Sequence, residues 1–117
     1  MMKSTVTYIG DMAFAFEEEK VLILFGTQAP AELRDISVIH EPVEVDRGAL
    51  ASASRLVVGQ NEYEILSVGT EAMKNLAELG HLSIYFTDPP AEILPGSVYV
   101  KPFELPKVSI GTLIEIR

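Results

Sequence analysis

Short apolar segments separated by turn residues recur along the whole chain. Several of them alternate apolar and polar positions as a half-buried strand does, so that Leu82, Ile84 and Phe86 share one face. Turn-forming sequences such as Gly59-Gln60-Asn61 and Pro95-Gly96 lie between them. The pattern predicts strands at Thr5–Ile9, Ala13–Phe16, Val21–Phe25, Ser37–His40, Arg55–Val58, Glu62–Val68, Leu82–Phe86, Ser97–Lys101 and Thr112–Arg117. We therefore expect a mainly β protein, either a barrel or a sandwich.

One segment, residues 70–79, has the period of a helix instead. Thr70 can cap its first turn, Glu71 suits the positive end of the helix, and Gly80 can supply the left-handed residue that closes it. A helix of about 10 residues is unstable alone, so it should pack on the β-core. A weaker pattern predicts one helical turn over Pro30–Arg34, with Pro30 at its first position.

Size and hydropathy indicate a single domain over residues 1–117. The chain has a mass of 12.8 kDa, a mean hydropathy of +0.25 and no visible linker. Its longest apolar run, Val21–Phe25, is far short of the roughly 18 residues that span a bilayer. The first residues, Met1–Ser4, lack the apolar centre of a signal peptide, and there is no cysteine. A cytoplasmic protein without direct membrane insertion is expected.

The net charge of −8 makes nucleic-acid binding improbable, because affinity for phosphate backbones comes largely from Lys and Arg. An acidic surface suits a basic protein partner, which it would attract electrostatically. The same charge also serves solubility alone, and charge does not separate these two interpretations.

Few catalytic chemistries fit the composition. The absence of cysteine excludes thiol catalysis, and two histidines with scattered carboxylates do not make a zinc site. The chain has no phosphate-loop lysine motif, no dinucleotide-type glycine motif and no serine in a nucleophile elbow. We therefore expect neither a metal nor a cofactor.

His40 is the remaining candidate for chemistry. It ends the apolar stretch Ile36–His40, and the following Glu41-Pro42 should break the strand and leave the ring at an edge that a partner can reach. An imidazole is largely uncharged near neutral pH, so it can attack phosphorus without a separate base and form a phosphoramidate. Residues 26–28 are candidate donors to the phosphoryl oxygens, and Glu41 or Glu44 is a candidate to orient the other ring nitrogen.

The residues alone favour structural roles for both histidines. A histidine at a strand end is commonly satisfied by hydrogen bonds and does no chemistry. His81 follows Gly80 at the predicted helix-to-strand junction, where capping or packing is its simplest role.

A series of short motifs runs through nearly the whole chain. They are Ala29-Pro30 with Leu33, Ile39-His40, Gly48-Ala49-Leu50, Gly59-Gln60 with Tyr63, Val68-Gly69, Asn75-Leu76, Leu79-Gly80-His81, Pro95-Gly96-Ser97-Val98 and a terminal Gly-Thr-apolar strand. With these motifs in this order and spacing, the chain resembles the glucitol/sorbitol-specific enzyme IIA component family of the bacterial phosphoenolpyruvate-dependent sugar phosphotransferase system. Residues 41–47 match no motif of that family.

The resemblance implies a small closed β-barrel with one short helix, at about residues 70–79. It implies that His40 is the catalytic phosphoacceptor, taking a phosphoryl group from the phosphocarrier protein HPr. His40 would pass that group to the IIB part of a glucitol/sorbitol permease, whose IIB and IIC components are the membrane partners. His81 falls on a position typical of the family and is a possible ligand of the phosphate.

Two other functions are compatible with a small β-barrel. A regulatory or protein-interaction barrel without phosphotransfer predicts a His40 that is buried or locked by hydrogen bonds. A barrel that binds a small molecule or a metal predicts a closed polar cavity.

Overall fold

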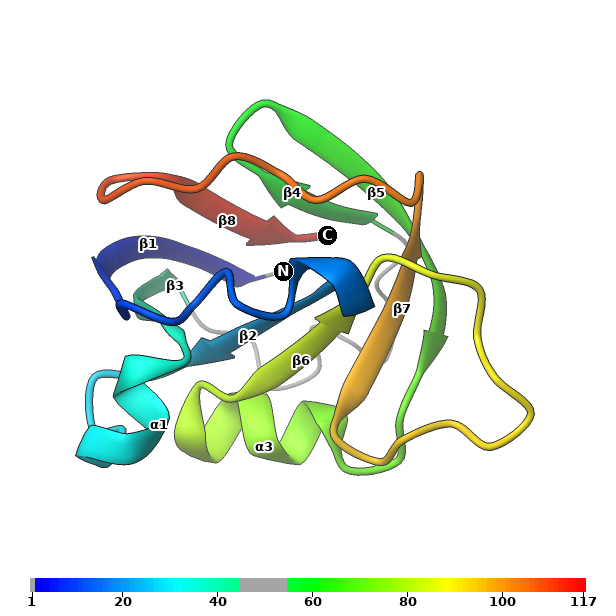
Figure 1. Cartoon of the computed structure of the whole chain (residues 1–117), viewed down its shortest axis with the longest axis horizontal. Coiled ribbons are helices and arrows are strands. Elements are labelled where there is room, and N and C mark those ends of the chain that lie inside the picture. The colour runs from blue at the N-terminus through cyan, green and yellow to red at the C-terminus, as the bar shows by residue number, and fades with distance from the viewer. Residues whose placement is uncertain (1, 45–54) are drawn as a thin grey trace.

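Eight strands form a closed barrel in the computed structural model, which describes residues 2–44 and 55–117 (Figure 1). Around the barrel the order is β1-β3-β2-β6-β7-β5-β4-β8. The strands are β1 Met2–Ile9, β2 Val21–Phe25, β3 Val38–Glu44, β4 Arg55–Val58, β5 Asn61–Val68, β6 Leu82–Tyr85, β7 Ser97–Lys101 and β8 Leu113–Ile116. The predicted mainly β class and the closed barrel are confirmed.

Alternating side chains of the strands fill the barrel. On β2 and β6, Leu22 pairs with Ile84 and Leu24 with Leu82, and all four side chains are buried. Each such side chain contributes about 1.5–3 kcal/mol by leaving water. The inward faces of the other strands join the same core, so the apolar period of 2 in the sequence is the period that closes the barrel.

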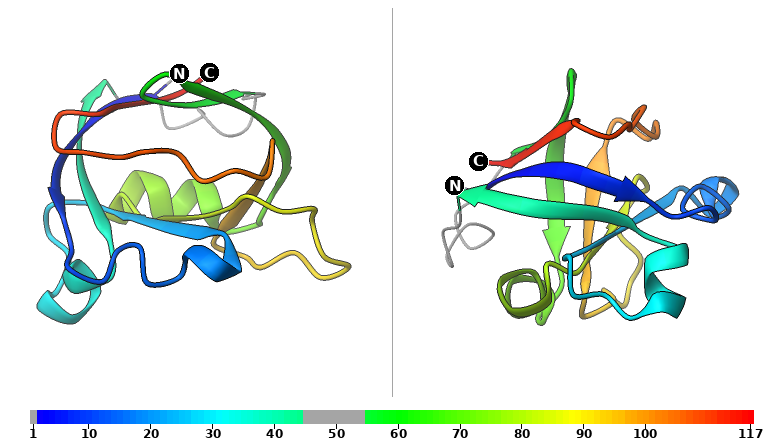
Figure 2. Two further views of the ribbon diagram at one scale, coloured as in Figure 1. Left: turned by 45° about the horizontal axis from the view of Figure 1, so that its top comes forward. Right: turned by 90° about the vertical axis from the view of Figure 1, so that its left-hand side faces the viewer.

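The barrel mixes two kinds of strand pairing. Most neighbours are antiparallel, but β2 runs parallel to β3, and β6 runs parallel to β7. β1 lies between β3 and β8, and its pairing places Met2 opposite Ile116. The two ends of the chain therefore lie side by side (Figure 2).

The predicted helix is present as α3, Ala72–Leu79, and it packs on the barrel through the buried side chains of Ala72 and Leu76. Gly80 closes it in the left-handed conformation at φ 66°, as predicted. The cap expected from Thr70 is wrong, because Glu71 occupies the N-cap position and no side chain caps the helix. The first backbone N–H groups bond instead to backbone carbonyls of Gly69 and Pro95.

Two shorter helical segments lie between the first strands. The weaker helix prediction corresponds to α1, Ala31–Asp35, with Pro30 at the N-cap rather than at the first helical position. The 3-10 helix η1, Glu17–Glu19, is exposed.

Two expectations about strands are wrong. The strand predicted at Ala13–Phe16 is a series of turns, because the N–H of Ala13 bonds locally to Gly10 and leaves no ladder to extend. The strand break predicted at Glu41-Pro42 is also absent, since β3 continues to Glu44. After Ile39, which pairs with Phe25 of β2, the only described strand that pairs with β3 is β1. A proline is tolerated there because one side of the strand has no ladder to lose.

Candidate functional site

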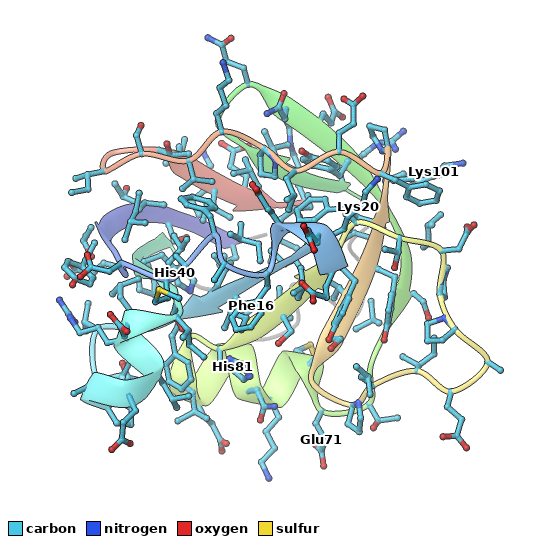
Figure 3. All side chains as sticks on the ribbon, viewed as in Figure 1. Phe16, Lys20, His40, Glu71, His81 and Lys101 are labelled. Atoms are coloured by element: carbon cyan, nitrogen blue, oxygen red, sulfur yellow. The ribbon has the colours of Figure 1, made fainter. Side chains whose placement is uncertain are left out.

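His40 lies inside the molecule, contrary to the expectation of an exposed ring at a strand edge. It stands on β3 opposite Val6 of β1, and its exposed fraction is 0%. Its ring is enclosed between β1 and the junction of α3 with β6, where His81 is located (Figure 3). A partner molecule does not reach this ring in the described conformation.

Both ring nitrogens of His40 have hydrogen-bond partners. Nδ1 lies 2.7 Å from Oγ of Ser4, and Nε2 lies 2.7 Å from the carbonyl oxygen of Gly80. A carbonyl oxygen only accepts, so Nε2 carries the proton and donates the hydrogen bond to the carbonyl of Gly80. In the neutral ring, Nδ1 then accepts from the hydroxyl of Ser4. The carboxylate expected to orient the ring, from Glu41 or Glu44, is thus replaced by a buried serine.

Burial keeps this ring uncharged. Desolvation lowers the pKa of His40 below its ordinary value, and the hydrogen bond to the Gly80 carbonyl offsets part of that effect. Neither hydrogen-bond partner, the hydroxyl of Ser4 or the carbonyl of Gly80, carries a negative charge that would stabilise a protonated, positively charged ring. The ring is neutral near pH 7, which is the form that acts as a nucleophile.

Backbone, rather than a side chain, covers Nε2 of His40. The N–H of Gly26 bonds to the carbonyl of Leu79 at 2.9 Å, which holds the end of α3 against the end of β2. A Cβ on Gly80 would lie 2.8 Å from both Cα and N of Gly26 and 3.4 Å from Nε2 of His40. Two glycines therefore allow the chain segments to close over the ring.

His81 follows directly after the residue that holds His40. Its Nδ1 lies 3.2 Å from the carbonyl oxygen of Leu24, and its ring packs on Phe25 with centroids 4.8 Å apart. Because the carbonyl requires Nδ1 to donate, Nε2 is the unprotonated nitrogen of the neutral ring. The ring is partly exposed. The structure therefore connects the two predicted histidines through the backbone of Gly80.

The donors expected from residues 26–28 are partly engaged elsewhere. The N–H of Gly26 is used by Leu79, and Nε2 of Gln28 lies 3.5 Å from the carbonyl oxygen of Glu78. Both contacts join this turn to the C-terminal end of α3. The motif Gly48-Ala49-Leu50 lies outside the described residues.

Ser4 and the Gly80 carbonyl are the site components that sequence reasoning missed. Ser4 is 36 positions from His40, and only the register of β1 against β3 brings its side chain to the ring. Gly80 was identified as the end of a helix, but its carbonyl carries no sequence signature of contact with His40.

The described residues 2–44 and 55–117 contain no group of three or more His, Asp or Glu side chains that could hold a metal ion. In the same part of the chain, no helix has the length and apolar character required to cross a membrane.

Comparison with known proteins places the chain in a family. Residues 1–115 match the model for the glucitol/sorbitol-specific IIA component of the phosphotransferase system (PTS). The glucitol/sorbitol-specific EIIA component of Escherichia coli K12 is 36% identical over 98 residues, which cover 84% of this chain and 79% of the relative. The relative of the same name from Shigella flexneri matches to the same extent. The crystal structure of a PTS system IIA component from Enterococcus faecalis V583 is 33% identical, with a TM-score of 0.85 and 98% of each chain covered.

Proposed function

Because the chain belongs to the glucitol/sorbitol-specific IIA component family of the sugar phosphotransferase system, we propose that it is a phosphocarrier whose acceptor is His40. His40 takes a phosphoryl group from phosphorylated HPr and passes it to the IIB part of a glucitol/sorbitol permease. This exchange takes place in the cytoplasm, at the inner face of the membrane that holds the permease.

The family match over residues 1–115 is the observation that carries the proposal. The protonation state of His40 agrees with it, because burial keeps the ring neutral. A neutral imidazole attacks phosphorus directly, and the resulting phosphoramidate passes its phosphoryl group on readily.

Transfer requires that one nitrogen of His40 lose its partner, and Nε2 is the one that can. Its partner is a backbone carbonyl at the left-handed Gly80, in the connection between α3 and β6. Nδ1 instead faces Ser4, which is fixed in the barrel wall. When the Gly80 carbonyl moves away, Nε2 gives up its proton to solvent and Nδ1 takes up a proton from solvent. Nε2 then bonds to phosphorus as the bond between phosphorus and HPr breaks, with no net proton released.

His81 is proposed to support the phosphoryl group. Because it adjoins Gly80, a displacement that frees Nε2 of His40 also moves His81. The same displacement frees the N–H at Nδ1 of His81 from the carbonyl of Leu24, so that the ring can donate to a phosphoryl oxygen.

The complete burial of His40 favours one rival, a regulatory or interaction barrel of the same fold without phosphotransfer. In that function the bond to Gly80 never opens. The two functions differ in a single event, which is the appearance of a covalent phosphoryl group on this protein.

Incubation with phosphorylated HPr, followed by the intact mass of the protein, tests the proposal. The wild type should gain one phosphoryl group and lose it again when the IIB component is added. His40→Gln should gain none, whereas His81→Gln, a matched loss of one imidazole, should still gain it more slowly. A wild type that gains no phosphoryl group, or a His40→Gln variant that gains it fully, contradicts phosphotransfer through His40.

A further inference from the structure

Among the residues that the structure describes, Ser4 is the one whose side chain hydrogen-bonds to the ring of His40. It lies on β1 between the two neighbouring strands, opposite Pro42 of β3 and Ile114 of β8. Its exposed fraction is 0%, and its Oγ is 2.7 Å from Nδ1. A serine hydroxyl buried in a barrel wall is held in place by the sheet, so it can fix the plane of the imidazole.

The chemistry of a hydroxyl differs from that of the carbonyl on the other side of the ring. The carbonyl of Gly80 accepts only, and so it is compatible with a single protonation state of Nε2. The hydroxyl of Ser4 both donates and accepts, and its hydrogen rotates to suit its partner. Ser4 therefore bonds to Nδ1 whether or not that nitrogen carries a proton.

This difference matches what phosphoryl transfer demands of the ring. Before transfer Nε2 carries the proton, and Nδ1 accepts from Ser4. After transfer Nε2 carries phosphorus, Nδ1 carries the proton, and Ser4 must accept. A buried N–H without an acceptor would cost free energy in the phosphorylated protein.

We infer that Ser4 is a positioning residue that reverses its hydrogen bond to Nδ1 of His40 and thereby stabilises the phosphorylated ring. The inference rests on the proposed phosphocarrier function and adds to it a residue that acts through His40 and does not touch the phosphoryl group.

The test compares Ser4→Ala with Ser37→Ala, a matched loss of a buried hydroxyl. Ser37 also has an exposed fraction of 0%, and its hydroxyl donates to the carbonyl of Leu33 at 2.6 Å, away from the ring of His40. Phosphoryl transfer from phosphorylated HPr should slow by on the order of tenfold in Ser4→Ala. Ser37→Ala should keep the wild-type rate, and Ser4→Thr, which retains the hydroxyl, should recover most of it.

Nitrogen-15 NMR of histidine-labelled wild type provides a readout that a purely structural role would not move. The expected result is a proton on Nε2 of His40 in the unphosphorylated protein and on Nδ1 in the phosphorylated protein. The phosphorylated fraction at equilibrium with HPr should also fall in Ser4→Ala. A wild-type rate and equilibrium in Ser4→Ala, or phosphorylation at Nδ1, would overturn the role of Ser4 while leaving His40 as the carrier. Wild-type protein that takes up no phosphoryl group would overturn both.

Discussion

Gly26 and Gly80 approach each other so closely that neither position has space for a side chain. A Cβ on Gly80 would lie 2.8 Å from the backbone of Gly26, and one on Gly26 would lie 2.7 Å from the carbonyl oxygen of Leu79. This contact joins the end of β2 to the end of α3 and closes the chain over His40. The proposed site is thus covered by backbone that glycine alone permits.

The first prediction concerns Gly80. Gly80→Ala should lower the free energy of unfolding by at least about 2 kcal/mol, because it combines a left-handed φ with a clash against backbone. Gly59→Ala is the matched control, since Gly59 has a φ of +62° but its Cβ would meet only Thr112, at 3.5 Å. It should cost about 1 kcal/mol. Urea unfolding of the two variants measures the difference, and equal losses would show that the contact with Gly26 is not tight.

The second prediction concerns pH. Burial holds the pKa of His40 below its ordinary value, so the unfolded chain binds a proton at a higher pH than the folded protein does. His40 should therefore reduce the free energy of unfolding as pH falls below about 6.5, with a slope of at most about 1.4 kcal/mol per pH unit. Urea unfolding from about pH 8 to about pH 5 measures this slope. His40→Gln should remove that part of the pH dependence, and parallel curves for the two proteins would contradict it.

The third prediction separates the two histidines. His81→Phe keeps an aromatic ring against Phe25 but removes the nitrogen proposed to contact the phosphoryl group. The rate of phosphorylation by HPr should fall by on the order of tenfold, the usual effect of losing one hydrogen-bond donor to a charged group. The final extent of phosphorylation should be close to that of the wild type. Quenched time courses measure both quantities. A complete loss of phosphorylation with normal folding would instead make His81 the acceptor.

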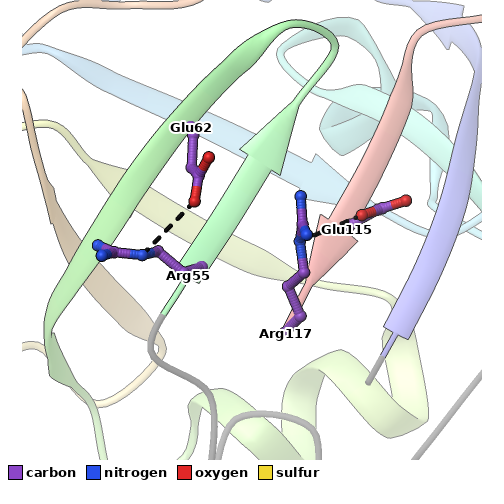
Figure 4. Close-up of polar contacts among 4 residues, drawn as sticks. All are labelled: Arg55, Glu62, Glu115 and Arg117. Carbon is purple, nitrogen blue, oxygen red and sulfur yellow. Dashed lines mark ion pairs between the residues drawn. The ribbon is translucent and has the colours of Figure 1, made fainter.

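The fourth prediction concerns the two faces of β4. Arg55 pairs with Glu62 at 3.5 Å, and these side chains are 47% and 59% exposed. Figure 4 shows this pair beside that of Arg117 with Glu115, whose side chains are 51% and 18% exposed. Arg55→Ala should therefore change the free energy of unfolding by less than about 0.5 kcal/mol. The adjacent Leu56 points into the core, and Leu56→Ala should cost about 2–5 kcal/mol. Thermal or urea unfolding compares them, and similar losses would contradict the assignment of faces.

Local patterns predicted most of the barrel. The bounds of Val21–Phe25, Arg55–Val58 and Ser97–Lys101 are the same in the sequence prediction and in the structure. These strands are short apolar runs between clear turn residues, so the information that defines them is local. Gly80 was likewise recognisable, because a left-handed helix end favours glycine.

What the sequence could not predict depends on partners far along the chain. Pro42 stays in a strand because β3 has one neighbour at that point, and Met2 belongs to β1 because it pairs with Ile116. The same applies to the site. His40 could be singled out by its chemistry, but its burial and its contact with Ser4 arise from the register of two strands that are remote in sequence.

The location of the phosphoryl group within the wild-type protein tests the central proposal most directly. After incubation with phosphorylated HPr, the protein is digested and its fragments are sequenced by mass spectrometry under mildly alkaline conditions, where phosphoramidates persist. The phosphocarrier function through His40 predicts one phosphoryl group on the fragment that contains His40. A phosphoryl group on the fragment with His81, or on no fragment at all, would contradict it.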